Sequence, residues 1–429
     1  MKFKRFLIVA ISLGLLIASS NALSGTTSRQ QFSIGYPSVA CPATLNGLAS
    51  QVSVASRSTK IYKVGSSSTK FVKSRALRVP VPGDPILVDA QGATPIVWQS
   101  RQGSWAGGTI CSIPAASQWF VGGAADITAR GKLILVNSGL SESVADVYVW
   151  SGTTPSTSKA VSVAANSFAT LGLDALAPGE SSIVLRVVSR SGRLNAFVID
   201  ERGKGLRTLG GDLVSPGSAP STELVIPAVP LQKRVANAPA QQLRLLAPGE
   251  ADANVSVEIV SGDGRFTPVG FDQVTVKKGQ VVNLPLSPSV KSSVYGLRIT
   301  SDEPIVAGVY ANVGRDFVWS SAVPPLSTFT MAMSGLTPLL VFVGDNINVE
   351  LEVSLAGGKK VRKSVRGDDI AFWRVPNNAR NLTFTRVSAN TYASALQTSV
   401  NGFGSIPLYA GSVLTKSAIP TANIRVLNP

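Results

Sequence analysis

The stretch GKLILVNSGLSESVADVYVW, residues 131–150, decides the fold class. The first half contains the apolar run LILV (133–136), and in the second half Ala145, Val147 and Val149 recur at every second position; Gly, Ser and Glu separate the halves. Alternation with a period of two is typical of half-buried strands, and the separating residues are typical of a turn. Similar short runs recur along the chain without the 3.6-residue period of an amphipathic helix. The sequence therefore predicts an all-β protein.

The same pattern returns about 110 residues later, which indicates an internal repeat. Residues 131–150 resemble QQLRLLAPGEADANVSVEIV (241–260), residues 161–173 resemble 274–286, and residues 184–198 resemble 296–310. A third, shorter copy begins near PLLVFVGDNINVELEVSL (338–355) and continues through 382–396. TPIVWQSRQGS (94–104) resembles EPIVAGVYANVG (303–314), so the N-terminal part is a copy as well.

Four units follow from these copies, and short strands with frequent turns favour immunoglobulin-like β-sandwiches. The predicted boundaries are 1–22 for a signal peptide, 23–118 for a basic β unit with a disulfide, and 119–227, 228–325 and 326–429 for three sandwich repeats, the last one shortened. A propeller is the alternative, but its blades repeat at roughly 40 to 50 residues. Each unit is expected to bury its apolar side chains separately from the others.

An apolar residue followed by proline is expected to close each unit, at Pro114, Pro227, Pro324 and Pro420. Proline has no ladder donor, so it is expected to end the last strand and to begin an extended connector. In CSIPAASQWFVGG (111–123), Trp119 and Phe120 then fall in the first connector. We expect this aromatic pair to pack against both neighbouring units. The rival interpretation is an aromatic platform for sugar rings.

The N-terminus MKFKRFLIVAISLGLLIASSNALSG has the pattern of an export signal. Lys2, Lys4 and Arg5 precede an apolar run, and Ser20 and Ala22 suit a signal peptidase. The run is shorter and more polar than the roughly 20 apolar residues that span a bilayer. We expect a secreted protein, with an uncleaved N-terminal anchor as the alternative.

The formal net charge is +16, and the basic residues gather near the N-terminus. Residues 23–83 contain no Asp or Glu, but they contain eight basic residues: Arg29, Arg57, Lys60, Lys63, Lys70, Lys73, Arg75 and Arg78. A field of one sign attracts polyanions or an anionic surface. For an exported protein the expected partner is an anionic wall polymer or a membrane surface rather than nucleic acid, and other envelope proteins are further candidates. A solvated face that only aids solubility is the plainer interpretation.

The two cysteines, Cys41 and Cys111, are expected to form a disulfide, because an exported chain meets an oxidising environment and the count is even. A cysteine nucleophile would need a base, and the chain contains no histidine. Without histidine, the usual catalytic triads and most transition-metal sites also lack their normal participants. No cofactor and no metal site is expected.

Carboxylate pairs are the remaining candidates for catalysis, because a glycosidase needs only two of them. The candidates are Glu350 with Glu352, Asp302 with Glu303, and Asp368 with Asp369. Glu350 and Glu352 are expected on the solvent face of one strand, and the Asp pairs in turns. GGKKVRKSVRG (357–367) predicts a basic hairpin, either a charged edge strand or a second anion-contacting strip.

Several motifs resemble one known family. These are Cys41-Pro42, then Cys111 followed by WFVGG up to Gly123, then LILVNSG and ADVYVW. This order resembles the exported actinobacterial domain-of-unknown-function 5719 family from about residue 35 onward. The resemblance implies an exported protein and a β fold, and it implies no activity, since none is assigned to that family.

Together these patterns predict an exported, non-enzymatic cell-envelope protein, a structural or adhesive scaffold that binds anionic wall or membrane components. The alternative is an array of carbohydrate-binding modules or, less favoured, a glycan-acting hydrolase.

Overall fold

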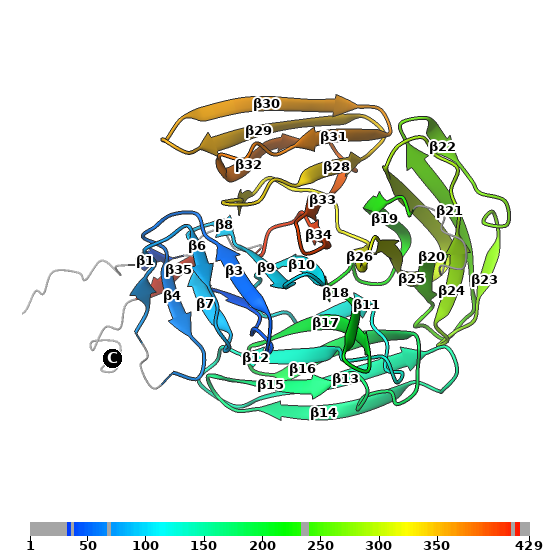
Figure 1. Ribbon diagram of the computed structural model, residues 1–429, viewed down its shortest axis with the longest axis horizontal. Helices are drawn as coiled ribbons and strands as arrows, with labels where there is room; N and C mark the ends of the chain where they lie inside the picture. Colours follow the sequence, from blue (N-terminus) through cyan, green and yellow to red (C-terminus); the bar gives the residue numbers. More distant parts are fainter. Residues whose placement is uncertain (1–31, 36–37, 67–69, 233–239, 413–416, 421–429) are drawn as a thin grey trace, which may run out of the picture. The chain divides into compact units, whose positions relative to one another are not determined.

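The computed structural model describes residues 32–35, 38–66, 70–232, 240–412 and 417–420. Every regular element in these ranges is a β-strand, which confirms the all-β prediction (Figure 1). The expected signal peptide and Arg29 lie outside the described residues. Contacts divide the chain into two units. In the smaller unit, β1 (Phe32–Gly35) pairs antiparallel with β35 (Ser417–Pro420), which contains the marker Pro420. The larger unit, Pro37–Thr415, holds all other strands in four pairs of sheets.

The first sheet pair has the strand orders β2-β7-β4-β5 and β10-β9-β3-β6. Its strands are β2 (Val39–Cys41), β3 (Ala49–Ser53), β4 (Lys60–Lys63), β5 (Val72–Lys73), β6 (Arg78–Pro80), β7 (Ile86–Asp89), β9 (Ile96–Arg101) and β10 (Trp105–Ile110). Val52 of β3, Val88 of β7 and Val97 of β9 are all fully buried in one core cluster, so the two sheets face each other.

The second sheet pair has the orders β11-β16-β13-β14 and β15-β12-β17-β18. Its strands are β11 (Ser117–Val121), β12 (Lys132–Asn137), β13 (Ser143–Ser151), β14 (Thr157–Val163), β15 (Ser167–Gly172), β16 (Ile183–Ser191), β17 (Leu194–Lys204) and β18 (Arg207–Val214). Residues 131–150 form β12, the turn after it and most of β13, as the apolar pattern of this stretch predicts.

The third sheet pair is connected by one long strand, because β25 belongs to both of its sheets. One half of β25 pairs with β19 and β21, and the other half pairs with β20 and β26. The strands are β19 (Ser221–Pro230), β20 (Gln241–Leu246), β21 (Ala253–Ser261), β22 (Gly264–Phe266), β23 (Val274–Val276), β24 (Val282–Leu286), β25 (Val294–Val313) and β26 (Asp316–Ser321).

The fourth sheet pair has the orders β30-β29-β32-β27-β8 and β31-β28-β33-β34. Its strands are β8 (Ala93–Thr94), β27 (Thr330–Ala332), β28 (Leu339–Val343), β29 (Ile347–Leu355), β30 (Lys360–Gly367), β31 (Ile370–Arg374), β32 (Ala379–Val387), β33 (Tyr392–Thr398) and β34 (Phe403–Pro407). The strand β8 comes from the N-terminal part of the chain and pairs in parallel with β27. The fourth sheet pair therefore includes a strand from the N-terminal part of the chain.

The last strand of each sheet pair lies at the middle of the larger unit (Figure 1). The strand β10 contacts β18, β18 contacts β26, β26 contacts β34, and β34 contacts β10. Close approach of these strands requires glycine. At Gly107 an added Cβ would meet the carboxylate of Asp212 and the backbone of Leu213, and at Gly211 it would meet the indole of Trp105. The four sheet pairs therefore share a tightly packed centre.

The expectation that each unit buries its apolar side chains separately is wrong. Leu133 and Leu135 of β12 face the core of their own sheet pair, but Ile134 and Val136 belong to the core cluster of the first pair. Likewise, Trp319 of β26 belongs to the core cluster of the second pair. A strand whose apolar residues run without interruption, as in LILV, is buried on both faces. Such strands join neighbouring sheet pairs into one body.

The expectation that Pro227 ends a strand is also wrong. Pro227 lies inside β19, at a point where the register with β25 shifts between Ile226 and Val229. A bulge leaves a residue without a ladder bond, so a proline is tolerated there. Pro114 and Pro324 follow the central strands β10 and β26, as expected. The predicted boundaries after residues 118 and 227 fall within β11 and β19.

Candidate functional site

The six cations predicted to bind anions all lie at one edge of the first sheet pair, and all are exposed. Lys60 and Lys63 belong to β4, Lys73 to β5 and Arg78 to β6, whereas Lys70 and Arg75 flank β5. We call these six residues the basic surface. The edge strands β5 and β6 belong to the two facing sheets, so the basic surface covers the open side of this pair.

Few acidic groups neutralise the basic surface. Lys63 forms an ion pair with Asp84 at 2.8 Å between Nζ and Oδ2. Lys60 lies directly opposite Lys73 across β4 and β5, and opposite Asp89 on its other side. Like charges that face each other across a strand pair destabilise it by roughly 0.2–1 kcal/mol. A bound anion would remove that repulsion.

An open hollow of about 440 Å³, called the cavity below, lies among the side chains of the basic surface. Four of the six cations line it, namely Lys63, Lys70, Lys73 and Arg75. Its apolar lining was not predicted from the sequence, and it consists of Ile61, Tyr62, Val72, Ala76, Val79 and Pro80. The sequence feature that could have indicated this apolar lining is the mixture of apolar and basic residues in KIYK (60–63) and FVKS (71–74). Lys60 and Arg78 are not part of the lining. Arg78 packs against Gly335 of the fourth sheet pair instead.

The predicted connector position of Trp119 and Phe120 is wrong, because both lie in β11 and pair with β16. Their apolar character fits an extra strand as well as a joint. Phe120 is fully buried in the core of the second sheet pair. Trp119 is 5% exposed and packs with Leu246 and Val306 of the third pair. Trp119 therefore joins the second and third sheet pairs, rather than the first and second.

The Trp119 ring is covered by neighbouring side chains. The ring of Trp150 stacks on it at 5.3 Å between centroids, and the Arg186 guanidinium lies 5.1 Å from its centroid. A sugar platform needs an open aromatic face, so Trp119 lacks the exposure that this role requires. Gly123, at the end of the same motif, has a φ of 103°, which is the sharp turn expected of it.

The most unusual polar group of the structure is the carboxylate of Asp316, at the start of β26. It is 4% exposed and accepts four backbone N–H hydrogen bonds. Oδ2 accepts from Ala106 of β10 at 3.2 Å and from Phe403 of β34 at 3.1 Å. Oδ1 accepts from Gly211 of β18 at 3.1 Å and from the adjacent Phe317 at 2.8 Å. One side chain thus connects the central strands of all four sheet pairs, and no motif in the sequence marked it.

Further buried polar groups surround Asp316. Asp212 is fully buried and accepts from the backbone N–H of Trp319 at 2.7 Å. The Trp319 indole donates to Asp200 at 2.8 Å, and Arg244 lies over the same ring at 4.6 Å. Burial lowers the pKa of Arg244 to about 9, and burial holds the pKa of Asp212 well above its usual range. These contacts hold the buried side chains at the centre of the larger unit in place.

The pKa of Asp316 gives a pH dependence of stability. Burial raises this pKa to about 7, although the four N–H donors act to lower it. Between pH 4 and pH 7 the native carboxyl then keeps a proton that the unfolded chain has released, so the free energy of unfolding falls as the pH rises. Over about three pH units the fall from this group is about 4 kcal/mol.

Urea unfolding between pH 4.5 and 8 measures this effect. The wild-type curve should exceed that of Asp316→Asn by more at pH 5 than at pH 8. Parallel curves for the two proteins would show that Asp316 does not titrate in this range.

Each candidate catalytic carboxylate pair has at least one member held by a structural partner. Glu352 forms an ion pair with Lys360 at 2.7 Å, and Glu350 lies 3.8 Å from Arg386. Both glutamates lie on the less buried face of β29, as expected. Asp369 forms an ion pair with Arg265. The basic hairpin forms β30, which is an edge strand paired with β29, also as expected.

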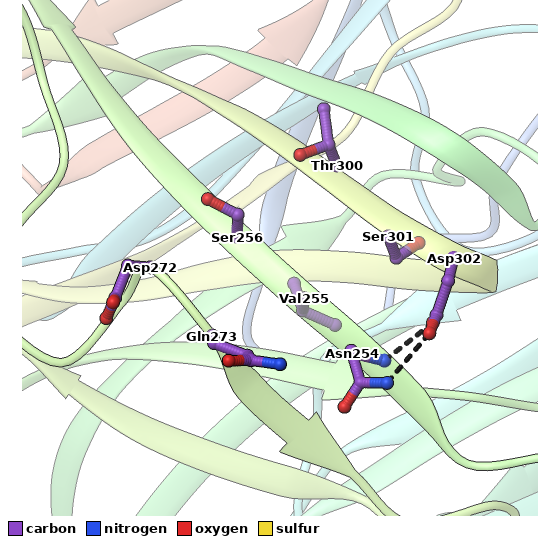
Figure 2. A pocket seen from close by; sticks show the side chains of 8 residues that line it. All are labelled: Asn254, Val255, Ser256, Asp272, Gln273, Thr300, Ser301 and Asp302. Atoms are coloured by element: carbon purple, nitrogen blue, oxygen red, sulfur yellow. Dashed lines mark hydrogen bonds between the residues drawn. The ribbon is translucent and has the colours of Figure 1, made fainter.

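Asp302 lines a second, shallow hollow of about 390 Å³ on the third sheet pair (Figure 2). Its two carboxylate oxygens accept from the backbone N–H and the side-chain amide of Asn254, each at 2.7 Å. These hydrogen bonds lower the pKa of Asp302. Asp272 and Gln273 also line the hollow, and in Figure 2 the Asp272 carboxylate points away from Asp302, whereas the Gln273 side chain points towards Asn254. The two carboxylates therefore do not face one another across a common position.

Comparison with known families identifies the chain. The model of a family of unknown function, DUF5719, matches residues 89–366, which is well over half of the 429 residues. The chain belongs to this family. The DUF5719 match includes the central strands β10, β18 and β26, with Asp212 and Asp316. It begins after the basic surface and its cavity, which lie outside it. A search of curated proteins found no significant match.

No cluster of three or more metal-ligating side chains occurs among the residues that the structure describes. In the same ranges, no helix has the length and apolar character needed to cross a bilayer.

Proposed function

We propose that this DUF5719 protein is an exported, non-enzymatic scaffold or adhesive protein of the cell envelope, which binds anionic wall or membrane components through the basic surface. The observation that carries the proposal is the gathering of six exposed cations at one edge of the first sheet pair. Lys63 forms an ion pair with Asp84, and among the described residues no ion pair is found for Lys60, Lys73, Arg75 or Arg78. A field of one sign raises the local concentration of anionic partners.

The rest of the larger unit supports the scaffold role. Asp316 hydrogen-bonds to the central strands of the other three sheet pairs, and aromatic side chains join neighbouring pairs. Buried, fully hydrogen-bonded networks hold a structure in one arrangement. A body fixed in this way can present a binding edge without changing its own shape.

We also propose that the sheet pairs are immunoglobulin-like units. In the second pair, β12 pairs with β15 in one sheet and β13 pairs with β16 in the other. These pairings correspond to the B–E and C–F pairs of an immunoglobulin sandwich. The pattern is altered by β17, which pairs with β12 instead of β16, and extended by β18, which reaches the centre of the larger unit.

Export is the remaining part of the proposal. The disulfide between Cys41 and Cys111 is compatible with an oxidising compartment. The charged and apolar pattern of the N-terminal sequence also agrees with export.

Retention of the secreted protein on purified cell-wall material tests the proposal. Salt raised from about 50 to 500 mM should release the protein, because screening shortens the reach of exposed charges. The double variant Lys73→Glu/Arg75→Glu should bind about tenfold more weakly at low salt. The matched control is Lys204→Glu/Arg207→Glu, which reverses two exposed cations at the β17–β18 hairpin, away from the basic surface.

Equal loss in both double variants would point to net charge rather than to the basic surface, and it would contradict the proposal. Retention that resists salt but is relieved by a soluble sugar would favour the carbohydrate-binding alternative. Cleavage of wall glycan by the wild-type protein would overturn the non-enzymatic assignment.

A further inference from the structure

We infer that the cavity of the basic surface binds an amphipathic anion, whose single apolar chain enters the cavity while its phosphate or carboxylate headgroup is held by the cations at the opening. The inference rests on the proposed function, since it concerns the same surface, and it names the ligand class: a lipid-like molecule rather than a polar polymer.

The position of the cavity gives it an apolar interior. It lies where β4 and β5 of one sheet meet β6 of the facing sheet, at the open edge of the first sheet pair. Ile61 and Val79 line it and also pack against the core cluster of this pair, and Tyr62 is 7% exposed. The inner wall of the cavity is therefore continuous with a hydrophobic core.

Apolar side chains also surround the opening. Val72 lines the cavity and is 69% exposed, and the neighbouring Phe71 is 39% exposed and contacts the Tyr62 ring at 5.5 Å. Exposed apolar side chains beside a pocket are typical of ligand-binding sites. A volume of about 440 Å³ falls within the usual range of small-molecule sites, roughly 300–1,000 Å³.

The charges at the opening set the sign of the headgroup. Lys63, Lys73 and Arg75 line the cavity, and Lys63 has Asp84 as its ion-pair partner. Within the described ranges, no carboxylate lies within ion-pair distance of Lys73 or Arg75. Long basic side chains commonly place their methylene stems along apolar surface and their charge at the edge. This combination complements a molecule with one anionic end and one apolar end.

A polar polymer would use only half of this site. A chain of phosphates or uronates would contact the cations but would leave the apolar interior unoccupied. Transfer of apolar surface from water into such an interior is favourable. The apolar lining therefore favours an amphiphile as the occupant.

Binding of a series of n-alkyl phosphates to the full-length secreted protein tests the inference. The series runs from hexyl to dodecyl phosphate, is used below the micelle-forming concentration, and is measured by isothermal titration calorimetry. Each added methylene should tighten binding about fourfold until the cavity is filled, after which the affinity should stay constant. Inorganic phosphate should bind much more weakly than any long-chain member, and dodecyl trimethylammonium should not compete.

Two variants separate the chain from the headgroup. Val79→Trp fills the cavity and should remove the dependence on chain length. Val269→Trp is the matched control, because Val269 is 103% exposed and lies on the third sheet pair. Lys73→Glu/Arg75→Glu should weaken binding of decyl phosphate at least tenfold and keep the remaining chain-length dependence. The wild-type series does not depend on the folding of any variant.

The outcomes distinguish the inference from the proposed function. An affinity that does not change with chain length overturns the inference, even where salt-sensitive retention on wall material upholds the proposed function. Binding to anionic vesicles without binding of monomeric alkyl phosphate also overturns it, in favour of a membrane surface as partner. Tight, chain-length-dependent binding together with salt-resistant wall retention upholds the cavity and contradicts the proposed function.

Discussion

Asp316→Asn is expected to lower the free energy of unfolding by about 3–5 kcal/mol at pH 7.5. Each oxygen of Asp316 accepts hydrogen bonds from two backbone N–H groups. In the variant, the side-chain amide nitrogen replaces one of these oxygens, and its own N–H groups would then point at two backbone N–H donors. Those N–H groups would remain buried without an acceptor, and each unpaired group costs about 1–3 kcal/mol. The loss should be larger at pH 5, where the protonated carboxyl contributes most.

Chemical denaturation of wild type and variant measures this loss. Asp272→Asn makes the same chemical change at an exposed position, and it should alter stability by less than about 0.5 kcal/mol. A comparable effect of the two substitutions would mean that the four central strands do not depend on Asp316. The result would then remove the main argument for a fixed scaffold.

Removal of the disulfide is expected to cost about 4 kcal/mol in the chain-entropy model. The bond joins Cys41 of β2 to Cys111, which follows β10, across a sequence separation of 70. The enclosed segment carries the basic surface and its cavity. The crosslink reduces the number of conformations available to the unfolded chain. The double variant Cys41→Ala/Cys111→Ala should therefore unfold at a lower urea concentration than the wild type.

A reducing agent gives the control for this prediction. It should destabilise the wild type by the same amount as the double substitution, and it should leave the variant unchanged. A wild-type stability that does not respond to full reduction of the bond would contradict the prediction. Both cysteines are fully buried, so reduction has to be carried out on the unfolded chain before refolding.

In two copies of the predicted repeat, the aligned residues form two strands each. Residues 131–150 form β12 and β13, and the matching residues 241–260 form β20 and β21. The disulfide followed from the even cysteine count and is present. Membership of the DUF5719 family, which the motifs around Cys111 and Gly123 indicated, is confirmed.

The errors concern contacts between distant parts of the chain. Trp119 has the same neighbours in sequence whether it lies in a connector or in β11, and its partners Trp150, Leu246 and Val306 are 31 to 187 residues away. Pro227 likewise reads as a strand end until the bulge against β25 is known. The cavity needs β4 and β6 side by side, and they belong to different sheets.

By itself, the sequence determined the strand pattern, the repeat and the position of the basic residues, because alternation and spacing are properties of neighbours along the chain. Only the tertiary structure decided that four central strands meet at one buried carboxylate, and that the basic residues surround an apolar cavity. The physical reason is that burial and hydrogen-bond partners depend on which surfaces pack together. Asp316 reads locally as one more turn residue before a strand, and it becomes the centre only when β10, β18 and β34 bring their N–H groups to it.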